Sequence, residues 1–126
     1  MLRAPLLRLL LATLLAPSVL APTPPALAQG NGAYVAGIPD LPLMPGLQSL
    51  PDSGVVFDKP GGRIVEAFAE GEVTPQAVHG FYDRTLPQLG WQRAAAGAYL
   101  RDGESLSLEV DREAGGVTVH FRLSPQ

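Results

Sequence analysis

The chain has no cysteine at any of its 126 positions. This absence excludes disulfide bonds, a lipid anchor attached through cysteine, and the ordinary zinc sites built on closely spaced thiolates. Stability must therefore come from burial alone, which is marginal in a domain of this size. We therefore expect that the protein has a partner or forms a homodimer.

Basic residues are also scarce, with 9 Lys and Arg against 12 Asp and Glu. Arg3 and Arg8 fall in the predicted leader described below. Without them, seven basic side chains remain against twelve acidic ones, a formal net charge of −5. The sequence contains neither a basic run nor a basic helix face, which disfavours a nucleic acid or an anionic membrane surface as partner.

A comfortable membrane span needs about 20 apolar residues, and no run here is that long. Arg3 and Arg8 give the chain a positive beginning, and the run from Leu6 to Leu15 is almost wholly apolar. It precedes Ala26-Leu27-Ala28, the small-residue pattern that signal peptidase recognises. The sequence therefore predicts a signal peptide over residues 1–28, with cleavage after Ala28 and a periplasmic or secreted product. The alternatives are a cut after Ala21 and an uncleaved anchor.

Residues 29–53 form a predicted arm that is rich in proline and glycine. Proline fixes φ and removes a backbone donor, so Pro39, Pro42 and Pro45 argue against a regular helix or central strand there. The arm nevertheless carries apolar side chains that a solvated spacer would not need. They are Leu41, Leu43, Met44 and Leu47. We expect them either to dock on their own domain, covering Ile64 and Phe68, or to bind a partner.

Residues 54–126 are predicted to form a small domain organised around one helix. The segment from Thr74 to Gly90 has a capping hydroxyl, a proline at its first turn and an apolar stripe at helical spacing. Pro87 should distort its last turn, and Gly90 should end it. The short run Val55-Val56-Phe57 and the strand from Arg63 to Ala69 should pair as a hairpin before this helix.

Four further strands are predicted after the helix. Two short ones, 91–94 and 98–101, flank a turn, and two longer ones cover 104–111 and 117–123. The predicted fold class is therefore α+β: one helix packed on an antiparallel sheet of about five or six short strands, in the order β-β-α-β-β-β-β.

The last two strands suggest one set of reactive groups. If Val110 pairs with Val117, then Ser107 lies opposite His120 with Glu109 on a diagonal. A small hydrolase at Ser107 and His120 is an alternative, but a flat sheet face offers no oxyanion donors, and a solvated face explains these residues. His79 and His120 should lie on opposite surfaces, which argues against a metal site shared by the two. No metal, cofactor or catalytic residue is predicted.

Tyr82, Trp91 and Tyr99 could line a groove for a small ligand, which gives a carrier as another alternative. Such side chains more often fill the edge of a core with their polar tips in water.

Several short segments of the sequence resemble those of a group of small exported bacterial proteins of unknown function. They are Pro42 to Leu47 (PLMPGL), Phe57-Asp58 with Gly62 to Glu66, Phe81-Tyr82, and Leu86 to Trp91 (LPQLGW). The resemblance covers most of the chain after the leader and implies a domain type without a functional residue. The leading prediction is a non-enzymatic interaction or accessory domain of the cell envelope, binding a protein or another envelope component through a sheet edge or the arm.

Overall fold

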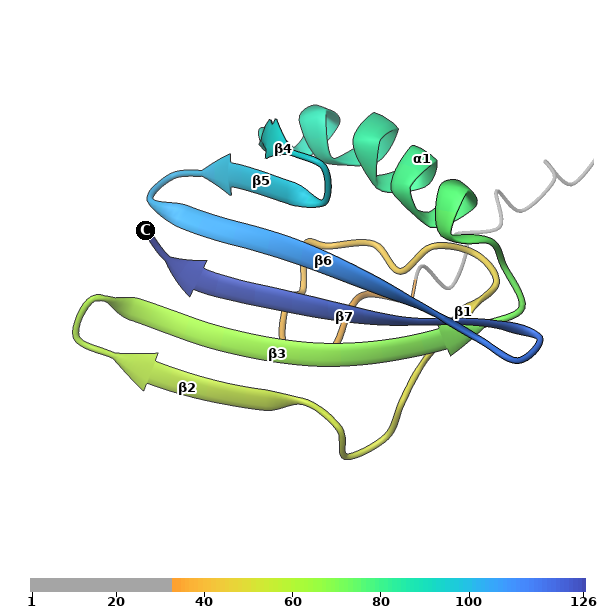
Figure 1. Ribbon diagram of the computed structural model, residues 1–126. Coiled ribbons are helices and arrows are strands. Elements are labelled where there is room, and N and C mark those ends of the chain that lie inside the picture. The colour runs from red at the N-terminus through yellow and green to blue at the C-terminus, as the bar shows by residue number, and fades with distance from the viewer. Residues whose placement is uncertain (1–32) are drawn as a thin grey trace, which may run out of the picture.

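A computed structural model describes residues 33–126 (Figure 1). The predicted leader and its cleavage site after Ala28 lie outside the described residues. In the part that is described, seven strands, one α-helix and one 3₁₀ turn follow one another. They are β1 (Leu47–Ser49), β2 (Val55–Lys59), β3 (Gly62–Gly71), α1 (Pro75–Thr85), η1 (Leu86–Leu89), β4 (Gln92–Ala95), β5 (Ala98–Arg101), β6 (Glu104–Glu113) and β7 (Gly116–Pro125).

The predicted α+β class with five or six short strands is wrong. The order is β-β-β-α-β-β-β-β, and three of the strands, β3, β6 and β7, are ten residues long, so the antiparallel sheet dominates the domain. The prediction missed β1, which lies in the predicted arm between prolines. A three-residue segment carries almost no periodic signal, and it becomes a strand only by pairing with the distant β3.

The sheet runs in the order β1-β3-β7-β6-β5-β4, with β2 also paired to β3. Because β7 occupies one side of β3, β1 and β2 both lie along its other side, β1 beside residues 69–71 and β2 beside residues 62–66. One edge of the sheet is therefore β4, and the other is shared by β1 and β2 (Figure 1).

The hairpin of β6 and β7 pairs two residues out of the predicted register. Val110 lies opposite Val119 and Arg112 opposite Val117, because the turn is tighter than expected and only Ala114 and Gly115 separate the strands. Gly115 adopts φ 83°, a left-handed conformation that glycine favours. A slip of two residues keeps every side chain on its predicted face, so the alternation pattern could not detect it.

The helix forms as predicted, with both ends marked by the expected residues. The Thr74 hydroxyl accepts a hydrogen bond from the Ala77 N–H (3.1 Å), and Pro75 occupies the first turn. The chain tightens into η1 around Pro87, and Gly90 ends the segment with φ 89°. The backbone N–H of Trp91 then donates to the Leu86 carbonyl, and the Trp91 side chain is buried.

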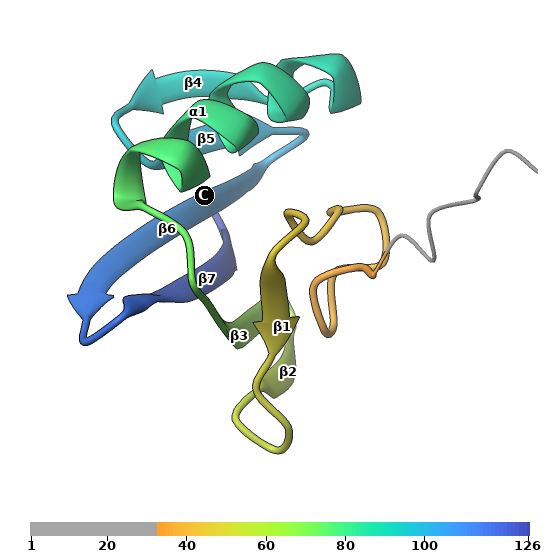
Figure 2. The same ribbon diagram turned by 90° about the vertical axis from the view of Figure 1, so that its right-hand side faces the viewer.

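The helix and the arm cover the same face of the sheet (Figure 2). That face presents Val65, Ala67 and Ala69 from β3, as well as apolar residues from β5, β6 and β7, and all of them are buried. Val35, Ile38, Leu41, Leu43 and Leu47 join them from the arm. The expectation that the arm covers Ile64 and Phe68 is therefore wrong, because those two side chains point to the other, outer face of β3.

Candidate interaction surface

The four apolar arm residues singled out in the sequence lie against their own domain. Leu41, Leu43 and Leu47 are buried, and Met44 is partly buried and packs against the core. The Tyr82 hydroxyl holds this segment by donating to the Pro42 carbonyl (2.9 Å) and accepting from the Met44 N–H (3.1 Å). In this structure the arm therefore presents none of these three leucine side chains to a partner.

The three aromatic residues considered for a ligand groove are core residues. Tyr82 and Tyr99 are 0% exposed and Trp91 is 3% exposed, so none of them lines an open groove. Burial raises the pKa of both tyrosine hydroxyls, and the hydrogen bond that Tyr99 donates to Asp83 raises the pKa of Tyr99 further. Arg101 lies over the Trp91 ring, 4.3 Å from its centroid, and its Nη2 contacts Asp40 of the arm at 2.6 Å.

The predicted serine and histidine pair does not form. With the observed register, Ser107 lies opposite Arg122, while His120 lies opposite Glu109. His120 Nδ1 is 3.6 Å from a Glu109 carboxylate oxygen, and Nε2 is 3.9 Å from one of Glu66. The imidazole stacks on Phe68 with centroids 4.3 Å apart and an 8° angle between planes. Its Nε2 is buried without a hydrogen-bond partner.

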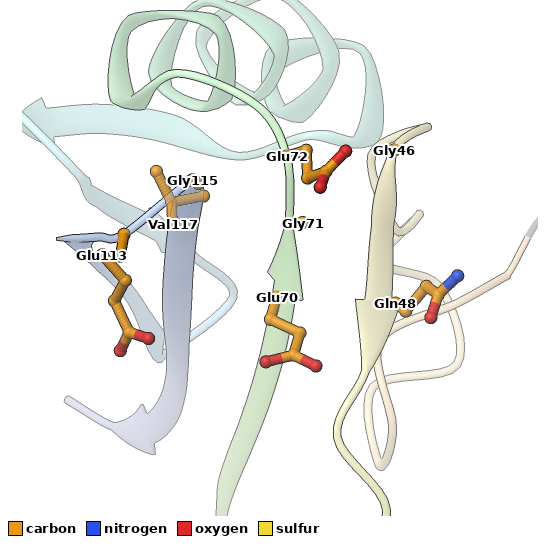
Figure 3. A pocket seen from close by; sticks show the side chains of 10 residues that line it. Gly46, Gln48, Glu70, Gly71, Glu72, Glu113, Gly115 and Val117 are labelled. Atoms are coloured by element: carbon orange, nitrogen blue, oxygen red, sulfur yellow. The ribbon is translucent and has the colours of Figure 1, made fainter.

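Three acidic residues line an open hollow at the end of the sheet where β3 and the turn between β6 and β7 meet (Figure 3). Glu70, Glu72 and Glu113 line it beside Gly71 and Gly116. Over residues 33–126, no three acidic or histidine side chains come together in a way that could hold a metal ion. Three separated carboxylates are the ordinary composition of a solvated rim, so this hollow indicates no specific chemistry.

The two edges of the sheet differ in how they are protected. At one edge, β4 is four residues long, its pairing with β5 is irregular between Arg93 and Ala95, and it carries polar and small side chains. A charged, bulged and short strand is the usual protection of an edge against pairing with another chain.

The β2 part of the opposite edge carries charges only at Asp58 and Lys59 and has no bulge. All five residues from Val55 to Lys59 are exposed, and their pairing with β3 is regular. Val55, Val56 and Phe57 are exposed by 39%, 57% and 59%. Exposed apolar residues on an unbulged edge strand are typical of a surface that accepts another strand.

The apolar side chains of β2 lie on both faces of the sheet. Val55 and Phe57 lie opposite Glu66 and Ile64 and therefore point to the outer face, whereas Val56 lies opposite the buried Val65 on the core face. A shallow hollow beside Phe57 is lined by Ile64, Glu66 and Arg122. A ligand lying flat on one face would leave part of this apolar surface uncovered, but a strand added in the plane of the sheet covers both sides.

Sequence reasoning placed β2 correctly in a hairpin but did not identify it as an exposed edge. The available signal was the run Val55-Val56-Phe57, three consecutive apolar residues where a half-buried strand alternates with polar ones. Consecutive apolar residues indicate a strand with both faces covered, but in the structure the three side chains stay 39–59% exposed. On the core face, the arm at Gly37 comes close to Val56.

Comparison with known proteins adds no further assignment. No protein-family model matches the chain, and neither a curated protein nor a solved structure matches it. The resemblance to small exported bacterial proteins therefore stays a prediction. Among residues 33–126, the single α-helix is neither long nor apolar enough to cross a membrane.

Proposed function

We propose that the protein is a non-enzymatic interaction domain of the cell envelope, periplasmic or secreted, that binds an extended polypeptide segment along β2. The observation that carries the proposal is the exposure of every residue of β2, including three consecutive apolar ones, on a regular and unbulged edge. The location rests on the predicted leader.

Strand addition explains this surface better than other modes of binding do. In this mode, main-chain hydrogen bonds provide affinity, and side chains on alternating faces provide specificity. Val55 and Phe57 would contact the added strand on the outer face, and Val56 on the core face. The predicted alternatives used Ser107 with His120, which the register separates, or a groove at Tyr82 and Trp91, which is filled.

A photo-crosslinking amino acid placed at Phe57 tests this function in the exporting cell. The control carries the same group at Gln76, which is exposed on the first turn of the helix and lies away from β2. We expect a covalent product between two polypeptides from position 57 and none from position 76. Equal products, or none from position 57, would overturn the proposed function.

A further inference from the structure

We infer that the strand accepted by β2 belongs to a second copy of this chain, so that two β2 strands pair antiparallel across a two-fold axis and join two sheets into one. The inference rests on the proposed function and names its partner. Self-complementarity of β2 in backbone, length and charge carries it.

The backbone pattern shows which residues of β2 have free hydrogen-bonding groups. Leu50 donates its N–H to the Phe68 carbonyl, so the backbone groups of Phe68 face the edge shared by β1 and β2. Along an antiparallel strand, the backbone N–H and C=O groups of successive residues point to opposite sides. The backbone groups of Glu66 and Ile64, two and four residues before Phe68, therefore also face this edge. Their partners Val55 and Phe57 use their groups toward β3, which leaves those of Val56 and Asp58 pointing outward.

This alternation restricts how two copies can pair. A residue whose backbone groups face outward must lie opposite an outward-facing residue of the second copy. The two-fold axis therefore places one residue opposite the same residue of the second copy, and not opposite its chain neighbour. An axis at Phe57 pairs all five residues of each β2, with Val56 opposite Asp58 and Val55 opposite Lys59. An axis at Val56 pairs only residues 55–57 within the two strands.

Charge excludes a third register. An axis at Asp58 would place two carboxylates directly opposite each other, which is destabilising in a sheet. The axis at Phe57 opposes no like charges and places the two Phe57 rings side by side on the outer face. Each ring also adjoins Ile64 of its own copy, so the apolar patch continues across the axis.

The local charge of β2 permits self-association at this edge. Residues 33–126 carry seven basic and twelve acidic side chains, so two copies repel each other in general. Strand β2 contains one acid, Asp58, and one base, Lys59, and is locally neutral. By contrast, the hollow at the other end of β3 holds three carboxylates.

Single cysteine variants test the axis directly, because the chain has no other thiol. Facing residues of a non-hydrogen-bonded antiparallel pair have Cα atoms about 4.5 Å apart, within reach of a disulfide. Under mild oxidation we expect Phe57→Cys to give a covalent dimer, and Leu100→Cys, an exposed control on β5, to give none. A dimer from Val56→Cys in place of Phe57→Cys would overturn the register.

Sedimentation of the purified chain across a dilution series supplies the second measurement. We expect a reversible dimer that Phe57→Lys weakens about tenfold or more, since two ammonium groups would face each other at the axis. Phe57→Leu should retain the dimer, and circular dichroism should show the same fold in both variants, because Phe57 is 59% exposed.

The outcomes separate this inference from the proposed function. A chain that remains monomeric but is crosslinked through position 57 to a different polypeptide in the cell overturns the inference and supports the function. A chain that is monomeric and forms no crosslink from position 57 overturns both.

Discussion

Tyr82 on the helix donates its hydroxyl hydrogen to the backbone carbonyl of Pro42, 40 residues earlier in the chain, over 2.9 Å. The same oxygen accepts the N–H of Met44. One buried side chain thus satisfies a carbonyl and an amide of a proline-rich segment that also forms backbone hydrogen bonds within the arm, such as Val35 N–H to Leu41 and Leu43 N–H to Ala33. This contact joins the arm to the helix on the same face of the sheet.

Replacing Tyr82 by Phe should lower the free energy of unfolding by about 1–3 kcal/mol, because the Pro42 carbonyl and the Met44 N–H lose their partner. Urea unfolding followed by fluorescence measures the change. Tyr34→Phe is the matched control, since Tyr34 is also in the arm but is 56% exposed, and it should leave stability unchanged. Equal losses in the two variants would contradict the role of this hydrogen bond.

Stability should fall in alkali because of the buried hydroxyls of Tyr82 and Tyr99. Their pKa values are raised in the folded chain above the ordinary value of about 10. Above that pH the unfolded chain releases protons that the folded chain retains, so the stabilisation is complete below about pH 10 and is lost as the pH rises further. Urea midpoints measured from about pH 8 to about pH 11 should decline, and less steeply in a double Tyr82→Phe, Tyr99→Phe variant.

Substituting Gly71 by Ala should destabilise the protein although Gly71 has an ordinary φ. A Cβ at this position would lie 2.1 Å from the backbone oxygen of Gly46, on the strand connection beside β1. We expect a loss of about 2 kcal/mol or more from this overpacking. Gly61→Ala is the control, since a Cβ there meets nothing within 4 Å, and it should change stability by less than about 0.5 kcal/mol.

The arm should behave as part of the core when its side chains are shortened. Leu41 is 1% exposed, so Leu41→Ala should cost about 2–5 kcal/mol through lost burial and the cavity that remains. Leu100→Ala removes the same atoms from a residue that is 38% exposed and should cost less than about 1 kcal/mol. Similar melting temperatures for both variants would show that the arm contributes no more to stability than this exposed site.

Local signals allowed the helix and individual turns to be predicted, although not the fold class. The cap at Thr74, the distortion at Pro87 and the end at Gly90 depend on residues within a few positions of one another, and each was identified in the sequence. The turn between β5 and β6 is another case. Asp102 and Gly103 both have positive φ there, as an Asp-Gly hairpin turn requires.

Features that depend on distant pairing could not be predicted in the same way. The register of β6 with β7 can slip by two residues without moving any apolar side chain to the wrong face, so only the tight turn at Ala114 and Gly115 decides it. That slip removed Ser107 from His120. Likewise, β1 exists only because residues 47–49 meet the end of β3.

The candidate interaction surface at β2 likewise depends on both local sequence and tertiary structure. The sequence by itself determined that residues 55–57 are strand-forming and apolar, that the chain has no thiols, and that the helix begins and ends where it does, because these follow from side-chain chemistry and local backbone preference. Tertiary structure alone decided which strand became the exposed edge. The arm and the helix both pack on the face of Val65 and bury their apolar side chains there, whereas β2 has one strand neighbour and apolar side chains on both faces.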